Sequence, residues 1–180
     1  VVSRLSHQKG LDVLLAALPA LVDRGGQLVL LGTGERALET AFTNAAAAHP
    51  HVAVQIGYDE ALSHRIIAGG DAIIIPSRFE PCGLTQLYGL RYGTVPVVAR
   101  TGGLADTVID ANLAALDAGC ATGVQFAPVT TVGLEQAIAR TCDLFGQPRT
   151  WAGMQRRAMR QAVGWDASAR AYLSLFETMI

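Results

Sequence analysis

Short runs of β-branched and other apolar residues alternate along the chain with longer stretches whose apolar residues recur at helical spacing. In the stretch Leu11–Val22 they recur every three or four positions, and Gly25 and Gly26 follow as a stop signal. Pro19 lies inside this stretch and predicts a kink or an early end of the helix. The apolar runs predict six strands, at Val1–Leu5, Gln27–Leu31, Val52–Ile56, Asp71–Ile75, Val95–Ala99 and Gly123–Phe126.

Helical spacing also predicts elements between and after these strands. The region 148–180 has no strand signal and predicts two closing helices, Pro148–Gln161 and Asp166–Ile180. Strands that are apolar throughout and alternate with helices are typical of a parallel sheet covered on both faces. The sequence therefore predicts one α/β domain, an open, doubly wound, Rossmann-like parallel sheet with closing C-terminal helices. The further predicted helices are Glu35–His49, Glu60–Ala68, Leu84–Tyr92 and Leu134–Phe145.

Composition narrows the class of protein. The chain has 180 residues, is 51% hydrophobic and 16% charged, and carries a net charge of −1, which favours a folded core over disorder. Without a basic excess, binding to nucleic acid is disfavoured, and no apolar run reaches the roughly 18 residues that a membrane span needs. Three widely spaced cysteines favour neither a disulfide framework nor a zinc site, as in a reducing cytosol. The chain starts at Val1, so we expect a longer parent protein.

The candidate chemistry lies in the loops that follow the strands. In doubly wound sheets, ligands bind outside the carboxyl ends of the strands. Each of these loops leads into a helix N-terminus, where free N–H groups and the helix dipole favour an anion. A phosphate ligand is the physical expectation. The loops selected by this rule are Ser6–Gly10, Gly32–Glu35, Gly57–Glu60, Pro76–Gly83 and Arg100–Gly103.

Two of these loops carry groups suited to a nucleotide sugar. Arg4 ends the first predicted strand and Lys9, the only lysine, precedes the first helix, so two cations can neutralise a diphosphate. In the loop Pro76–Gly83, Glu80 lies beside a glycine whose neighbouring N–H groups can bind phosphate oxygens. A carboxylate beside an anion site suits hydrogen bonds from sugar hydroxyls. Diphosphate and sugar together indicate a nucleotide sugar.

An alternative comes from the segment Gly32-Thr-Gly-Glu-Arg-Ala37, which matches the G-x-G-x-x-G/A fingerprint of dinucleotide binding. It follows a predicted strand and precedes a predicted helix, and Asp59 or Glu60 supplies an acid after the next strand. A nicotinamide-dependent dehydrogenase is therefore a rival reading. The fingerprint normally occupies the first strand-to-helix turn, however, and here it occupies the second. A tight turn without a ligand explains the same residues.

Four segments together resemble bacterial glycogen synthases and plant starch synthases. They are Ser3–Gly10, Ile56–Tyr58, Pro76–Leu87 and Arg100–Val108, and the similarity extends over essentially the whole chain. The resemblance implies a retaining glycosyltransferase with two Rossmann-like domains, the GT-B architecture. It implies that residues 1–180 form the C-terminal, donor-binding half, with 148–180 as a helical tail. The acceptor-side N-terminal domain of the family has no counterpart in this sequence.

The resemblance also implies a reaction and its catalytic residues. Glucose passes from ADP-glucose to the non-reducing end of an α-1,4-glucan with retention of configuration. Arg4 and Lys9 would stabilise the departing ADP phosphates, since charge fixed where negative charge develops is commonly the largest catalytic contribution. Glu80 would hold a glucose hydroxyl.

Substrate-binding roles follow by the same resemblance. Cys82, Gly83 and Leu84 would surround the glucose, and Thr85 with its backbone N–H would bind phosphate. Tyr58 would stack on adenine, and the alternative for this residue is a half-buried loop aromatic without a ligand. Cys82 has no neighbouring base in the sequence that would make its thiol a nucleophile.

The resemblance implies no metal ion and no cofactor, because the cations take the charge of the leaving group. The expected partners are ADP or ADP-glucose and, through the N-terminal domain, an α-glucan, in the cytoplasm of a bacterium. The 180 residues alone should bind ADP weakly and transfer no glucose. Two other functions stay open: the donor domain of another glycosyltransferase, such as a sucrose-type synthase, and a non-catalytic nucleotide-binding module.

Overall fold

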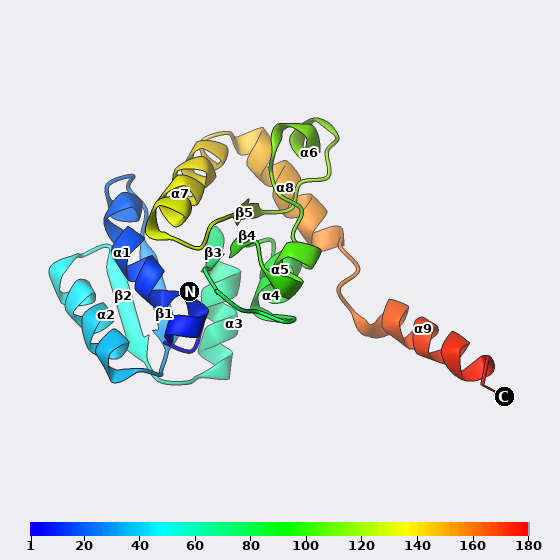
Figure 1. Ribbon diagram of the computed structural model, residues 1–180. Helices are drawn as coiled ribbons and strands as arrows, with labels where there is room; N and C mark the ends of the chain where they lie inside the picture. Colours follow the sequence, from blue (N-terminus) through cyan, green and yellow to red (C-terminus); the bar gives the residue numbers. More distant parts are fainter. Residues whose placement is uncertain (180) are drawn as a thin grey trace.

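The computed structural model describes residues 1–179 as an α/β body from which one C-terminal helix extends (Figure 1). The last residue of the predicted helix Asp166–Ile180 thus lies outside the described residues. In chain order the elements are the 3-10 helix η1 (His7–Lys9), α1 (Leu11–Val22), β1 (Leu28–Gly32), α2 (Arg36–Ala48), β2 (Val52–Ile56), α3 (Glu60–Gly69), β3 (Ala72–Ile75), α4 (Thr85–Tyr92), β4 (Val95–Ala99), α5 (Gly102–Thr107), α6 (Leu113–Asp117), β5 (Val124–Phe126), α7 (Thr131–Phe145), α8 (Pro148–Arg160) and α9 (Trp165–Glu177).

Strand β4 shows why both faces of the sheet are covered. All five of its residues are buried. Val97 and Ala99 join the cluster that includes α1 and α7, whereas Val98 joins a second cluster with Ile73 of β3 and Leu104 of α5. Successive side chains of a strand point to opposite faces, so a strand that is apolar throughout needs a partner layer on each side. The doubly wound α/β prediction is confirmed.

All strand pairing is parallel, in a two-stranded sheet β1–β2 and a three-stranded sheet in the order β3–β4–β5. The segment Val1–Leu5 lies between them. It is extended and joins β1 through isolated bridges, with Ser3 N–H donating to Leu31 O over 3.1 Å, while Val2 packs on the cluster that contains Ile73. A regular strand at Val1–Leu5 was predicted, and that detail is wrong because the segment pairs through single bridges to one neighbour.

The predicted helices α1 to α4, α7 and α8 form, with ends shifted by up to three residues. An early end at Pro19 is wrong, since α1 continues to Val22. Helix α7 starts earlier than predicted because the Thr130 hydroxyl accepts from Gly133 N–H and caps it. The short helix α6 was missed, although its cap, Asn112, is a standard start signal.

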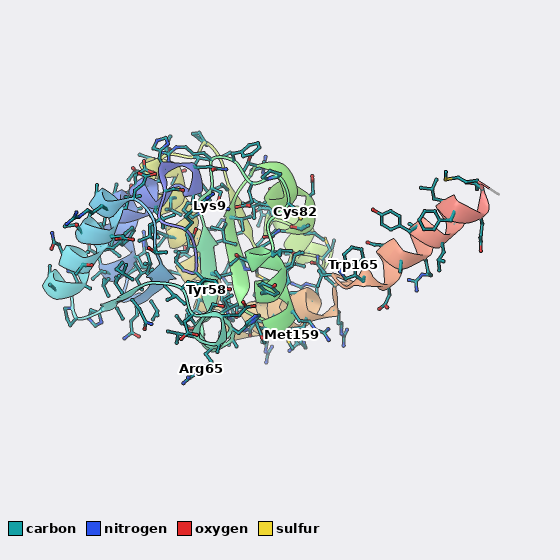
Figure 2. All side chains as sticks on the ribbon, turned by 90° about the horizontal axis from the view of Figure 1, so that it is seen from below. Lys9, Tyr58, Arg65, Cys82, Met159 and Trp165 are labelled. Atoms are coloured by element: carbon teal, nitrogen blue, oxygen red, sulfur yellow. The ribbon has the colours of Figure 1, made fainter. Side chains whose placement is uncertain are left out.

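The two C-terminal helices behave differently. Helix α8 buries Trp151, Met154 and Ala158 against the body, as predicted. Helix α9 has no buried residue and extends away from the body in both views (Figures 1 and 2), with Trp165 77% exposed at its start. The predicted second C-terminal helix thus forms as α9, but all of its residues are exposed, so it does not pack on the body as α8 does. Among the described residues, no helix combines the length and apolarity that crossing a membrane requires.

Candidate functional site

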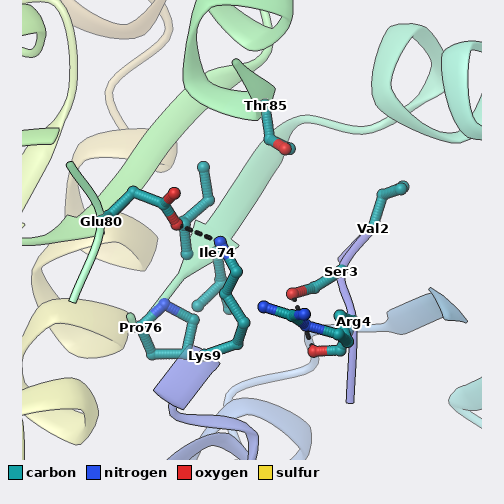
Figure 3. A pocket seen from close by; sticks show the side chains of 9 residues that line it. Val2, Ser3, Arg4, Lys9, Ile74, Pro76, Glu80 and Thr85 are labelled. Carbon is teal, nitrogen blue, oxygen red and sulfur yellow. Dashed lines mark hydrogen bonds and ion pairs between the residues drawn. The ribbon is translucent and has the colours of Figure 1, made fainter. Parts of the chain in front are cut away.

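A pocket of about 140 Å³ opens where Val1–Leu5 and β3 end, between the two sheets. It brings together four of the predicted site residues, each from a different part of the chain (Figure 3). Arg4 lies in the extended segment Val1–Leu5, Lys9 belongs to η1, Glu80 lies in the loop after β3 and Thr85 starts α4. Two cations, a carboxylate and a helix N-terminus therefore share one concave site, as the sequence predicted.

Lys9 and Glu80 form an ion pair inside this pocket. Lys9 Nζ lies 2.5 Å from Glu80 Oε2, and the Ser77 hydroxyl donates to the same oxygen over 3.0 Å. Glu80 is only 9% exposed. A carboxylate this deeply buried requires such partners, because an unpaired buried charge is costly. The pocket thus holds its own opposite charges together when no ligand separates them.

Close backbone contacts place Lys9. Gly10 follows it with φ of 68°, and a Cβ added there would lie 1.9 Å from the carbonyl oxygen of Pro76. Only glycine fits this conformation and this approach. In addition, Arg78 N–H donates to Gln8 O over 2.9 Å, so the turn that carries Lys9 rests directly on the loop that carries Glu80.

Arg78 is a residue that the sequence reasoning missed. Its guanidinium donates to both oxygens of Asp12, over 2.6 and 2.7 Å, and to His7 O over 2.6 Å. Hydrogen bonding to Arg78 holds the pKa of the Asp12 carboxyl below its ordinary value. The guanidinium of Arg78 therefore joins η1 and α1 to the loop after β3. The available signal was an arginine inside the loop Pro76–Gly83.

The loop between Glu80 and Thr85 packs on the N-terminus of α5. Gly103 N–H donates to Glu80 O over 3.0 Å, and a Cβ on Gly103 would lie 2.1 Å from Cys82 O. This contact gives Gly103 a structural role. Cys82, Gly83 and Leu84 lie in the loop beside the pocket and not among its lining residues.

Tyr58 lies apart from the pocket lining. Its ring follows β2, is 80% exposed, and its hydroxyl donates to Glu60 Oε2 over 2.5 Å. That hydrogen bond raises the pKa of the Tyr58 hydroxyl. The structure therefore fixes the hydroxyl end of Tyr58 and leaves its ring accessible, without bringing it to Arg4, Lys9 or Glu80.

The glycine turn that matched the dinucleotide fingerprint binds its own carboxylate. Gly34 N–H and the Thr33 hydroxyl donate to Glu39 Oε1 over 2.8 and 2.7 Å, and the bond from Gly34 lowers the pKa of Glu39. Asp59, the acid offered for a ribose, instead caps α3 by accepting from Leu62 N–H over 2.9 Å. Both features of the fingerprint serve the fold, which argues against a dehydrogenase.

Comparison with known proteins agrees with this site. The chain is 65% identical over 179 residues to a glycogen synthase from Paracoccus denitrificans and 64% identical over 181 positions to one from Roseobacter denitrificans. These alignments cover 99% and 100% of this chain but only 38% of each relative. The catalytic domain of starch synthase IV from Arabidopsis thaliana, solved with ADP and acarbose, matches with a TM-score of 0.88 and 33% identity over 98% of this chain and 37% of that chain.

A family model described as glycosyl transferases group 1 matches residues 1–155. These residues include both sheets, the pocket and every predicted site residue. Because the match covers most of the sequence, this chain belongs to the group 1 glycosyltransferases.

Proposed function

We propose that this chain is the donor-binding domain of a glycogen or starch synthase, which transfers glucose from ADP-glucose to an α-1,4-glucan with retention. The observation that carries the proposal is the convergence of Arg4, Lys9, Glu80 and Thr85 on one pocket at the carboxyl ends of parallel strands. The 65% identity to a glycogen synthase and the ADP in the related starch synthase structure support it.

When the donor binds, its diphosphate replaces the Glu80 carboxylate as the anion that pairs with Lys9. The diphosphate of ADP-glucose brings negative charge to the pocket, and Lys9 moves from Glu80 toward it. Glu80 keeps the Ser77 hydroxyl, 3.0 Å away, and its carboxylate becomes available to hydroxyls of the glucose. Both observed bonds use Oε2, and within residues 1–179 no hydrogen bond reaches Oε1. One acceptor oxygen is thus already available for a sugar.

The cations then stabilise the leaving group. As the bond between the anomeric carbon and the β-phosphate oxygen breaks, negative charge grows on ADP, and Arg4 and Lys9 are placed to stabilise it. Thr85 offers its hydroxyl and its N–H at the start of α4, where the helix dipole favours phosphate. Arg4 and Lys9 provide the positive charge that stabilises the leaving ADP, so we propose that the reaction requires no metal ion.

The remaining sequence predictions become part of the same proposal. Cys82, Gly83 and Leu84 surround the glucose from the loop between Glu80 and Thr85, and Tyr58 presents its accessible ring to adenine. The chain spans 38% of the length of the curated relatives. We therefore propose that an N-terminal domain binds the acceptor glucan. We also propose that the protein acts in the bacterial cytoplasm.

The test is a chimera. Residues 1–180 replace the matching segment of the Paracoccus denitrificans glycogen synthase, and transfer of labelled glucose to glycogen is measured with ADP-glucose or UDP-glucose as donor. We expect transfer from ADP-glucose, unaffected by a metal chelator. Transfer only from UDP-glucose would contradict the donor assignment. A folded chimera that binds ADP without transferring from either donor would instead favour a non-catalytic module.

The isolated chain provides the control. It should bind ADP weakly in a calorimetric titration and should transfer no glucose by itself. Incorporation of glucose into glycogen by the 180 residues alone would contradict the role proposed for a second domain.

A further inference from the structure

The loop beside the donor pocket rests on a buried polar side chain that has no role in the site described so far. Gln86, in the first turn of α4, is fully buried. Its Nε2 lies 3.0 Å from Cys82 O, 2.9 Å from Gly83 O and 3.2 Å from the Thr107 hydroxyl, and one of its two hydrogens is shared between two of these acceptors. The hydrogen bonds of a buried side-chain amide hold the backbone that it contacts in one conformation.

The chemistry of the partners settles which end of the amide faces the loop. Both carbonyl oxygens of the loop accept hydrogen bonds and cannot donate, so the nitrogen of Gln86 faces them. Its oxygen, Oε1, has no hydrogen-bond partner within the described residues. It lies 2.5 Å from where a Cβ at Gly83 would be, and Gly83 has φ of 75°. Position 83 therefore accepts glycine alone without displacing Gln86.

The inward carbonyls determine where the loop N–H groups point. The peptide bonds Cys82–Gly83 and Gly83–Leu84 are trans. In a planar trans peptide the C=O and the following N–H point in opposite directions. Because Cys82 O and Gly83 O point inward to Gln86, the N–H groups of Gly83 and Leu84 point outward. Within residues 1–179 neither N–H has a backbone acceptor.

The same side chain also reaches the backbone of Glu80 through α5. The Thr107 hydroxyl, which accepts from Gln86, donates in turn to Gly103 O. Gly103 N–H then donates to Glu80 O over 3.0 Å. Gln86 is thus connected to both ends of the segment between the buried carboxylate and α4.

We propose that Gln86 is a positioning residue for the donor: by holding the carbonyls of Cys82 and Gly83 inward, it aims the Gly83 and Leu84 N–H groups at oxygens of ADP-glucose. This inference rests on the proposed function for the identity of the ligand. The orientation of the two N–H groups is a property of the chain alone, and it can be measured without a ligand.

The test compares Gln86, in the first turn of α4, with Gln155, which belongs to α8 and binds the opposite end of α4. Gln155 Nε2 donates to Gly93 O, after the end of α4, over 2.9 Å, so Gln155→Met removes the same kind of bond far from the pocket. In Gln86→Met we expect affinity for ADP-glucose to fall about tenfold, the usual cost of losing aligned hydrogen bonds to a charged ligand. In Gln155→Met, affinity should stay within twofold. Equal losses in both variants would overturn the proposal.

Amide NMR separates this proposal from the proposed function. In the wild-type chain the Gly83 and Leu84 amide signals should shift on addition of ADP-glucose. Their N–H residual dipolar couplings, recorded without ligand, should change in Gln86→Met and not in Gln155→Met. Unchanged couplings in Gln86→Met would overturn the role of Gln86. A wild-type chain that binds no ADP-glucose would contradict the donor assignment only.

Gly83→Ala is the second variant, for the case that Gln86→Met does not fold. The added Cβ would meet Gln86 Oε1 at 2.5 Å and displace the loop without removing the glutamine. We expect the same loss of affinity and an altered Leu84 coupling. Wild-type affinity together with an unaltered Leu84 coupling in Gly83→Ala would contradict the proposal.

Discussion

Two glycine-containing loops at the carboxyl edge of the sheets use their polar groups in opposite ways. In the Gly32–Glu35 turn, Gly34 N–H donates to the carboxylate of Glu39, which comes from the following helix. After the Pro76–Gly83 loop the following helix contributes Gln86 instead, which binds the loop carbonyls, and in residues 1–179 the N–H groups of Gly83 and Leu84 have no backbone acceptor. The first loop binds an anion of its own chain, and the second is the loop that we propose binds an external one.

The comparison shows that a glycine pattern before a helix predicts a tight turn but not a ligand. The decisive residue lies on the helix, within its first turn. A carboxylate there occupies the amides and repels phosphate, whereas a carboxamide orients the peptide planes without adding charge. Glu39 and Gln86 are therefore more informative than the glycines that precede them.

The largest expected effect tests whether the positive charge that Lys9 of η1 brings to the carboxylate of the second loop is functional. In the chimera, Lys9→Ala should lower the rate of transfer about 10²- to 10³-fold, as for the loss of one preorganised group at a developing anion. Steady-state transfer from ADP-glucose measures this. Arg36→Ala, which removes a cation at the start of α2 beside the other loop, is the matched control and should leave the rate unchanged.

Lys9→Ala also leaves the buried carboxylate of Glu80 without its cation, which lowers stability. The double variant Lys9→Ala with Glu80→Gln removes that penalty and should regain stability, measured by urea unfolding, without regaining activity. Recovery of activity together with stability would show that Lys9 serves the fold alone.

A smaller effect is expected at Tyr58, whose hydroxyl is bound and whose ring is accessible. Tyr58→Ala should weaken ADP binding about tenfold, as for the loss of one aromatic stacked on a base. Tyr58→Phe removes only the bond to Glu60 and should bind nearly as well as the wild type. Calorimetric titration with ADP distinguishes the two, and equal losses would assign the effect to the hydroxyl.

The alternation of apolar strands and helices was sufficient to predict the fold, because β4 and its neighbours need cover on both faces. It also predicted the convergence of Arg4, Lys9 and Glu80, since parallel strands bring their carboxyl ends to one edge. The pattern did not predict that Lys9 and Glu80 pair with each other, nor that Arg78 and Gln86 hold the loops. Those contacts join residues 66 or more positions apart, or depend on peptide orientation, and helical or strand spacing encodes neither.

A moderate effect, several-fold, is expected from Arg78→Met. The side chain of Arg78 joins the Lys9 turn to the second loop through Asp12 and His7 O, so its loss should raise the KM for ADP-glucose more than it lowers kcat. Arg78→Lys, which cannot form the two-pronged bond, should recover only part of the affinity. An unchanged KM would mean that the Gly10 contact with Pro76 positions Lys9 without help.

The smallest effect on binding is expected at Glu39, and it tests the first loop directly. Glu39→Ala frees Gly34 N–H and the Thr33 hydroxyl but should leave the affinity for ADP-glucose within twofold. The Glu39→Ala substitution should instead lower the free energy of unfolding, and the size of this loss should depend on pH. Because the pKa of Glu39 is lowered in the folded chain, its stabilisation is present above the unfolded pKa of about 4.3 and is lost as pH falls through the folded pKa.

Urea unfolding at neutral pH should therefore separate wild type from Glu39→Ala, and the two curves should converge in acid. A gap that persists in acid would mean that Glu39 acts through packing and not through its charge. If Glu39→Ala instead gained affinity for ADP-glucose or for NAD, the turn would be an anion site that Glu39 suppresses. The two loops would then differ only in which anion occupies them.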